Sequence, residues 1–293
     1  MSAPPGAVAE APAGLSRGRP AHGPFGRLFR SPQLIVGLAI IAMWIVCALF
    51  GLQFVPYDPY ADDLLNSLQP PSLEHWFGTD QLGRDIFSRV VVGARDILTV
   101  APLATLLGIV IGTTLGLVTG YFRGLVDEVA SRVIEAFLAL PLIIVALLAL
   151  VALGTSLGAV IIVIGVVFAP NIARTVRSAV IQEAQLDYVT AAALRSENAA
   201  HIMFVEILPN VTAPILVEAT VRLGYAVFTV ATLSFIGFGI QPPSADWGLA
   251  VADTYTLVLG AFWWPMLANA AAIVSLVVAL NLVGEGVKAA LDA

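Results

Sequence analysis

Long runs without a charged side chain are the feature that most constrains how this chain can fold. Three of them are bounded by Arg30 and Asp58, by Asp96 and Arg123, and by Glu135 and Arg174. An ionisable group near the centre of a bilayer costs at least about 2.5–3.5 kcal/mol, so such runs indicate membrane-spanning helices. The chain is 59 % hydrophobic and 12 % charged, whereas soluble proteins contain about 25 % charged residues. We therefore exclude a soluble globular domain.

The pattern of these runs predicts six spans. The run between 135 and 174 would form a helix of roughly 57 Å, which is too long for one crossing of a hydrocarbon core of about 30 Å. We expect it to turn back at the glycine- and serine-containing segment 154–158 and to form two short spans. The spans are expected at 34–55, between 96 and 123, on either side of 154–158, at 207–240 and at 261–283. The predicted fold class is an all-α polytopic membrane protein.

The basic residues in the loops predict the orientation, because they are enriched on the cytoplasmic side. An even number of spans places both termini on one side. Ten basic residues fall on that side: Arg17, Arg19, Arg27, Arg30, Arg123, Arg132, Arg174, Arg177, Arg195 and Lys288. Three fall on the other: Arg84, Arg89 and Arg95. Both termini are therefore expected in the cytoplasm, and the first span is expected to be a retained anchor because no A-x-A-like cleavage site accompanies it.

Several function classes are excluded by missing residues. Lys288 is the only lysine, and it is not preceded by the glycine spacing of a phosphate-binding loop, so the chain is not itself a P-loop ATPase. A single cysteine, Cys47, provides no disulfide framework. The histidines at 22, 75 and 201 show no metal-ligand spacing. We expect no catalytic residue, no metal site and no nucleic-acid partner.

Two features lie within the predicted spans. Gly108, Gly112, Gly116 and Gly120 repeat every fourth residue and form a groove for a neighbouring helix. This groove is compatible with a helix that slides against its neighbour and equally with static close packing. Glu218 and Arg222 are four residues apart and share one helix face, so they are candidates either for the translocation path or for a structural ion pair.

The stretch 187–210 lies between two spans on the predicted cytoplasmic side. Its alanine-rich beginning favours a short helix, and Pro209 and Asn210 interrupt the chain before the next span. A short helix that runs parallel to the membrane between two spans is suited to contact a soluble partner, although it could also lie idle at the interface.

This stretch resembles the coupling-helix loop of bacterial ABC importer permeases, through Asp-Tyr-Val-x-Ala-Ala followed by Ile-Leu-Pro-Asn. More narrowly, the chain resembles the C-type permease subunit of dipeptide, oligopeptide and nickel importers. Three further motifs agree and occur in the family's order: 77–89, 233–248 and 281–286. The resemblance covers about residues 32–292. The family usually has Glu where this chain has Thr190 and Gly where it has Ser196, and a serine there is expected to avoid strained backbone angles.

The resemblance implies the domain organisation and the partners. A disordered cytoplasmic tail is expected at 1–31, because its first thirty residues are rich in Ala, Pro, Gly and Arg and cannot build a core. The further expected parts are an anchor helix at 32–55, an extracytoplasmic loop at 56–96, a core of five helices at 97–286 that contains the coupling loop 187–209, and a cytoplasmic tail at 287–293. The implied partners are a homologous B-type permease, two ATPase subunits that bind ATP and Mg²⁺, and an extracytoplasmic substrate-binding protein. The implied location is the bacterial inner membrane.

The resemblance also assigns candidate site residues. ATPase docking is assigned to Asp187, Tyr188, Thr190, Ala191, Ala192, Ser196, Ile207, Leu208 and Pro209. Contact with the binding protein is assigned to Asp80, Arg84, Asp85, Gln241, Asp246 and Trp247, with packing of these loops onto their own span as the alternative.

The rival function is a self-contained secondary transporter or channel. Such a protein would be expected to show an internal repeat with interrupted midplane helices, or a filter motif, and neither is visible in the sequence.

Overall fold

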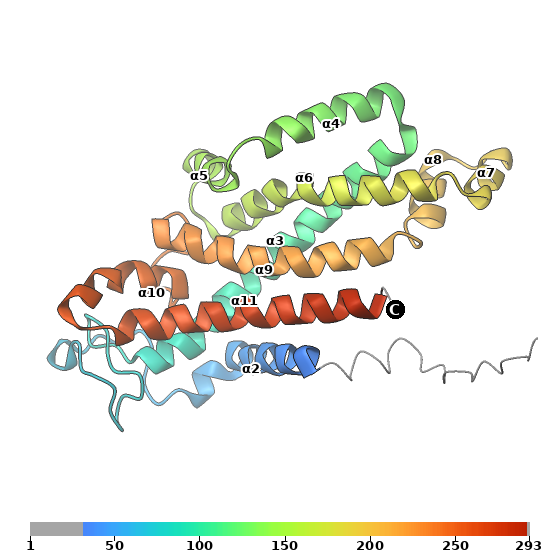
Figure 1. Cartoon of the computed structure of the whole chain (residues 1–293). Helices are drawn as coiled ribbons and strands as arrows, with labels where there is room; N and C mark the ends of the chain where they lie inside the picture. Colours follow the sequence, from blue (N-terminus) through green and yellow to red (C-terminus); the bar gives the residue numbers. More distant parts are fainter. Residues whose placement is uncertain (1–31, 292–293) are drawn as a thin grey trace, which may run out of the picture.

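The computed structural model describes residues 32–291, and the long helices among them are the expected membrane spans (Figure 1). Five are long and apolar enough to cross a bilayer: α2 (Pro32–Phe54), α3 (Ile86–Phe122), α6 (Leu157–Glu183), α9 (Thr212–Ile236) and α11 (Trp264–Leu291). A sixth crossing is formed if the bent pair α4 (Gly124–Leu138) and α5 (Leu142–Leu153) counts as one span. The prediction of an all-α polytopic membrane fold is confirmed. The N-terminal tail and its four arginines lie outside the described residues.

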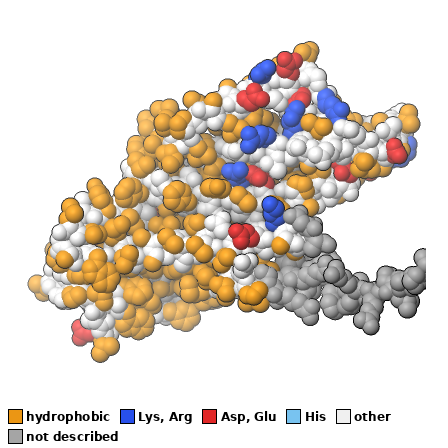
Figure 2. All heavy atoms as spheres, in the orientation of Figure 1, with side chains coloured by type: hydrophobic (Ala, Val, Ile, Leu, Met, Phe, Trp, Pro, Cys, Tyr) orange, Lys and Arg blue, Asp and Glu red, His pale blue; other side chains and the backbone are white. Residues whose placement is uncertain are grey.

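Shorter helical segments gather at the two ends of the molecule. At one end, called here the α7 end, lie α7 (Asp187–Leu194), α8 (Ala199–His201) and the π-helical turn η2 (Ile202–Ile207). At the opposite end, the α10 end, α10 (Trp247–Thr254) and η3 (Tyr255–Gly260) lie near the loop that holds η1 (Leu64–Asn66). Figure 2 shows Lys, Arg, Asp and Glu concentrated toward the α7 end, whereas most of the remaining visible face is hydrophobic.

The pair α3 and α6 forms the centre of the bundle, and the glycine row lies at their contact. A Cβ added at Gly112, Gly116 or Gly120 would lie 2.6–2.7 Å from the Cβ of Ile172, Val176 or Val180, respectively. A Cβ at Gly108 would lie 3.0 Å from the Gly165 carbonyl oxygen. The absence of side chains at these four positions therefore lets α6 pack directly on the α3 backbone.

The anchor helix α2 packs against the other end of the sequence. A Cβ at Gly37 would lie 2.8 Å from the Ala279 carbonyl oxygen, so α2 and α11 also approach at backbone distance. The Trp44 indole N–H donates to Ser275 Oγ at 2.9 Å. Its ring also packs edge-on against Trp247, with the two centroids 4.7 Å apart. The first span is thus part of the bundle.

Several predicted boundaries differ from the structure. The second span begins at Ile86, within the segment 56–96 expected to be a loop, because Asp85 caps the helix and Arg89 is buried against loop carbonyls. The predicted turn at 154–158 is present, but the helix after it is not short: α6 has 27 residues. α11 continues to Leu291, through much of the predicted tail 287–293.

The third crossing differs most from the expectation of a simple helix. It consists of α4 and α5, which are bent by 92° at the break between them. At 1.5 Å per residue, the 12 residues of α5 span only about 18 Å and cannot cross a bilayer alone. α4 carries Asp127, whose carboxylate accepts a hydrogen bond from Arg177 Nη2 of α6 at 2.6 Å. This ion pair fixes α4 against α6 despite the polar residues along it.

Candidate functional site

The segment between α6 and α9 folds into a protrusion at the α7 end (Figure 1). In α7, Val189 and Ala192 are 5 % and 0 % exposed and anchor the helix to the rest of the chain. Asp187, Thr190 and Ala191 are exposed on the outer surface. The helix therefore presents one face to its own chain and leaves another free.

Polar contacts fasten the base of this protrusion. The Tyr188 hydroxyl donates to Glu183 Oε1 at 2.9 Å and accepts from Asn210 Nδ2 at 3.2 Å. Asn210 Nδ2 also donates to the Glu206 carbonyl oxygen at 2.8 Å. Tyr188 thus joins the end of α6 to the segment before α9. Its hydroxyl is used within the chain, although the residue was predicted to contact the ATPase.

The remaining predicted docking residues divide by burial. Ile207 is 0 % exposed and Leu208 is partly buried, so both help to hold the protrusion. Pro209 is exposed. Ser196 is exposed as well, and its φ of +61° lies in the left-handed region. The expectation that a serine at 196 avoids such angles is wrong: the turn keeps a conformation that suits glycine, and the serine is strained.

An ion-pair network braces the protrusion. Arg195 Nε donates to Glu197 Oε1 at 2.8 Å, and Arg195 Nη2 lies 3.7 Å from Glu206 Oε1. His201 Nε2 lies 3.6 Å from Glu197 Oε2. This network was not predicted from the sequence, in which the four-residue spacing of Glu197 and His201 is the one signal for part of it.

Glu218 and Arg222 form the predicted pair within α9. Arg222 Nε donates to Glu218 Oε1 at 2.6 Å, and the two side chains are 19 % and 14 % exposed, respectively. Thr175 Oγ1 of α6 donates weakly to Glu218 Oε2 at 3.4 Å. The Arg222 guanidinium also lies 5.5 Å from the centre of the Tyr225 ring. The pair therefore lies at the α6–α9 contact and is partly open.

The charged residues before α3 form a tightly bonded loop at the α10 end. Asp80 is 7 % exposed and accepts hydrogen bonds from the backbone N–H groups of Leu82 and Arg84, at 2.9 and 3.0 Å. Asp85 is 3 % exposed and caps α3 by accepting from the Ser88 N–H at 2.8 Å. His75 Nδ1 lies 2.9 Å from the other Asp85 oxygen.

The loop before α10 is equally embedded. Asp246 is fully buried and caps α10 by accepting from the Leu249 N–H at 2.8 Å. Burial raises the pKa of the Asp246 carboxyl to about 6. The Trp247 indole is fully buried and donates to the Val90 carbonyl oxygen of α3 at 2.9 Å.

Four of the six residues predicted to contact a binding protein are buried in the structure. The burial of Asp80, Asp85, Asp246 and Trp247 leaves them no surface for a partner, and their hydrogen bonds hold the loops in place. Gln241 is exposed and Arg84 is partly exposed. Most of the residues in these two motifs therefore stabilise the loops themselves, as the alternative of packing predicted.

The comparisons with known proteins match both halves of the chain. Residues 112–293 match the family of binding-protein-dependent transport system inner membrane components. The chain belongs to this family. Residues 25–71 of the permease match the N-terminal transmembrane domain of oligopeptide transport permease C. The resemblance drawn from the motifs is therefore confirmed, and the permease is an inner-membrane transport component rather than an enzyme.

The permease has curated relatives along most of its length. It is 39 % identical over 269 residues to the dipeptide transport system permease protein of Alkalihalophilus pseudofirmus. This alignment covers 92 % of the permease and 88 % of the relative. It is 37 % identical to the oligopeptide transport system permease protein of Bacillus subtilis, over 90 % and 87 % of the two chains. The glutathione transport system permease protein of Escherichia coli O1:K1 is 38 % identical, over 92 % and 89 %.

A solved structure shares the fold. A chain of the MetNI methionine ABC transporter in an inward-facing conformation superposes with a TM-score of 0.57 at 22 % identity. The match covers 69 % of the permease and 96 % of that chain. The helical bundle of the permease is thus the fold of an ABC importer permease.

Proposed function

We propose that this permease is the C-type subunit of an ATP-driven importer of peptides or related small solutes. Relatives named for dipeptide, oligopeptide and glutathione transport support this substrate class. The subunit forms the translocation path together with a homologous B-type permease and receives its cargo from an extracytoplasmic binding protein. Two separate ATPase subunits bind ATP and Mg²⁺ and drive the cycle, so the permease itself requires no cofactor.

The observation that carries this proposal is the outward face of α7. Asp187, Thr190 and Ala191 are exposed, whereas Val189 and Ala192 fix the helix from behind. A short helix that is fixed on one face can pass the movement of a bound partner to the long helices that flank the protrusion, α6 and α9. We infer that this face docks into an ATPase subunit as the coupling helix.

The test replaces an exposed alanine on that face. In the complete complex reconstituted into liposomes, we expect Ala191→Arg to abolish substrate-stimulated ATP hydrolysis, because a long charged side chain would block docking without disturbing the interior. Ala289→Arg is the matched control, since Ala289 is an exposed alanine of α11 at the same end of the molecule. Full stimulation in Ala191→Arg would contradict the coupling assignment. Uptake by the purified chain without ATPase subunits would instead favour a self-contained transporter.

The α7 end is proposed to face the cytoplasm. Ten basic residues against three in the predicted loops support this orientation, as does the concentration of Lys and Arg toward that end in Figure 2. Cysteine labelling tests it in a Cys47→Ser background, because Cys47 is the only cysteine. A membrane-impermeant maleimide should label Leu65→Cys, at a position that is 94 % exposed, in intact cells. It should label Ala289→Cys, at an exposed position of α11 outside the proposed docking face, only after permeabilisation. The reverse pattern would contradict the orientation.

The pair Glu218–Arg222 is proposed to border the translocation path. It adjoins a groove of about 510 Å³ between α6 and α9 that is lined by Arg174, Thr175 and Pro214, among others. Because the two charges neutralise each other, the pair itself favours solutes of neither sign, and removal of one charge would expose the other. We expect Glu218→Gln to change KM for charged peptides more than for neutral ones. If the ratio of KM for charged peptides to KM for neutral peptides is the same as in the wild type, the pair is purely structural.

A further inference from the structure

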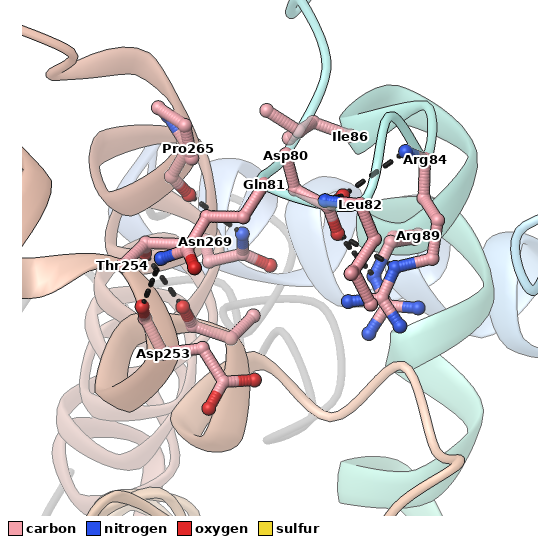
Figure 3. A pocket seen from close by; sticks show the side chains of 11 residues that line it. Asp80, Gln81, Leu82, Arg84, Ile86, Arg89, Asp253, Thr254, Pro265 and Asn269 are labelled. Carbon is pink, nitrogen blue, oxygen red and sulfur yellow. Dashed lines mark hydrogen bonds and ion pairs between the residues drawn. The ribbon is translucent and has the colours of Figure 1, made fainter. Parts of the chain in front are cut away.

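A polar pocket of about 230 Å³ opens at the α10 end, between the segment 80–89 and helices α10 and α11 (Figure 3). Arg84, Arg89 and Asp80 form one wall, and Asn269 lies on the opposite wall. Asp253 also lines the pocket, but it is exposed and its carboxylate points away from Asn269 in Figure 3. The volume is smaller than the roughly 300–1,000 Å³ of sites for drug-sized ligands.

The first wall carries two guanidinium groups and two carboxylates, and only one of these carboxylates, that of Asp80, is buried. The Asp80 carboxylate accepts from Arg84 Nε at 2.8 Å and lies 3.8 Å from Arg89 Nε, so two guanidinium groups share one buried carboxylate. Asp62, which is 3.9 Å from Arg84 Nε, has a side chain that is 56 % exposed and screens little.

The two arginines differ in what they leave free. Arg89 is 4 % exposed and uses both Nη atoms, which donate to the carbonyl oxygens of Pro59 and Ser244 at 3.0 and 3.2 Å. Arg84 is bonded through Nε, and within residues 32–291 neither of its Nη atoms has a hydrogen-bond partner. Arg84 thus offers free N–H donors beside the pocket, in a planar arrangement that matches a carboxylate.

The opposite wall offers an acceptor without a donor. Asn269 is 3 % exposed, and its Nδ2 donates to the Pro265 carbonyl oxygen at 2.8 Å. Because a carbonyl oxygen can only accept, this bond fixes the amide orientation and turns Oδ1 toward the pocket (Figure 3). Oδ1 is buried and has no hydrogen-bond partner in the described part of the chain. A buried acceptor of this kind is normally satisfied, so its presence calls for a donor.

We propose that this pocket binds a small carboxylate whose neighbouring group carries an N–H: an amino acid or the C-terminal residue of a peptide. The carboxylate pairs with the Arg84 Nη atoms, and the adjacent N–H donates to Asn269 Oδ1. The limited volume admits one or two small residues. As a peptide subsite on the outer face of the permease, this assignment rests on the proposed function and orientation.

Direct binding tests the proposal without ATP or transport. The full-length chain is purified with its co-purifying subunits and titrated by saturation-transfer NMR with N-acetylglycine, glycine and glycylglycine. We expect saturable binding that Asn269→Leu and Arg84→Met each weaken at least tenfold. Arg95→Met is the matched control, because Arg95 is an exposed arginine of α3, the helix that follows Arg84, and lies outside the pocket. N-acetylglycinamide, which lacks the carboxylate, should not bind.

The probes separate the two sources of the ligand. Binding of N-acetylglycine and glycylglycine assigns the site to peptide C-termini, whereas binding of glycine alone assigns it to free amino acids. Equal binding of inorganic phosphate, equal binding by Asn269→Leu, or no binding of any probe would overturn the proposal. Transport that is intact when binding is absent would overturn this site alone, and binding without ATP-driven uptake would overturn the proposed function alone.

Discussion

Ala191 and Ala192 are neighbours in α7, and the first is exposed whereas the second is completely buried. Both residues are alanines of the same helix, and both are predicted to take part in docking. The interior packs against one of them and solvent surrounds the other. Substitutions at these two positions therefore separate the effect on docking from the effect on folding.

We expect Ala192→Arg to destabilise the protein by more than about 4 kcal/mol, because it forces a charge into a packed site without a partner. Ala191→Arg should change the free energy of unfolding by less than about 0.5 kcal/mol, as exposed substitutions usually do. Thermal unfolding in detergent, monitored by size-exclusion chromatography, measures both. Equal loss of stability in the two variants would contradict the burial of Ala192 and the exposure of Ala191.

The glycine row predicts a second contrast. Gly112→Ala places a Cβ 2.6 Å from the Ile172 Cβ, so we expect overpacking to destabilise the protein by about 1–3 kcal/mol. Gly158→Ala in the first turn of α6 meets nothing within 4 Å and should be neutral or stabilise by up to about 1 kcal/mol. The midpoint of thermal unfolding compares them. A Gly112→Ala variant as stable as Gly158→Ala would refute backbone contact between α3 and α6.

The left-handed turn at Ser196 predicts a stabilising substitution. A non-glycine residue in this region costs about 1–2 kcal/mol, part of which glycine loses again through its greater freedom in the unfolded chain. We expect Ser196→Gly to raise the free energy of unfolding by roughly 0.5–1 kcal/mol. Ser178→Gly, in the interior of α6, should lower it by about 0.5 kcal/mol, because glycine is a poor helix former. Chemical denaturation of both variants provides the test, and a loss of stability in Ser196→Gly would count against the strained turn.

Asp246 predicts a dependence on pH. Burial raises the pKa of its carboxyl in the folded protein to about 6, against 3.8 for the free group. Its contribution to stability is therefore fully present below pH 4 and is lost as the pH rises through 6, by roughly 3 kcal/mol for two pH units.

The corresponding variant is Asp246→Asn, which keeps an acceptor for the Leu249 N–H but cannot ionise. We expect this variant to lose less stability between pH 4 and 6 than the wild type and to be more stable at pH 7. Thermal unfolding at several pH values measures the difference, with Asp253→Asn as the control for an exposed carboxyl on α10. Parallel pH curves for Asp246→Asn and the wild type would argue against a raised pKa.

The spans could be predicted wherever charge marks the membrane boundary, as in the runs that became α2 and α11. The same rule failed at Arg89, because it treats every charge as lying outside the membrane helix. Here the loop carbonyls of Pro59 and Ser244 accept the guanidinium N–H groups, so the helix extends ten residues beyond Asp96 toward its N-terminus and begins at Ile86. The rule also missed α4, whose Asp127 is neutralised by Arg177 of another helix. The sequence alone does not show which distant residue will neutralise a charge, because tertiary structure brings the two together.

The candidate sites show the same division. The motif around 187–209 located the protrusion, but the sequence did not distinguish Ala192 from Ala191 or show that Tyr188 holds the base. At the α10 end, Asp80, Asp85 and Asp246 were expected at a surface because they are charged. Backbone N–H groups satisfy the carboxylates of Asp80 and Asp85 in the interior. Asp246 is buried as well, although only one of its oxygens caps α10 and the other has no hydrogen-bond partner among residues 32–291. The orphaned acceptor of Asn269 had no sequence signal at all.

The contact between α3 and α6 has a mechanical consequence. Ile172, Val176 and Val180 of α6 pack over successive glycines of α3. If α6 moved along the axis of α3, each of these side chains would collide with the neighbouring residues of α3. Rotation of the two helices together causes no such collision. The two helices are therefore expected to move as one unit. α3, with 37 residues, is about 55 Å long and reaches from the base of the protrusion at η2 to the pocket at the α10 end, which Ile86 lines.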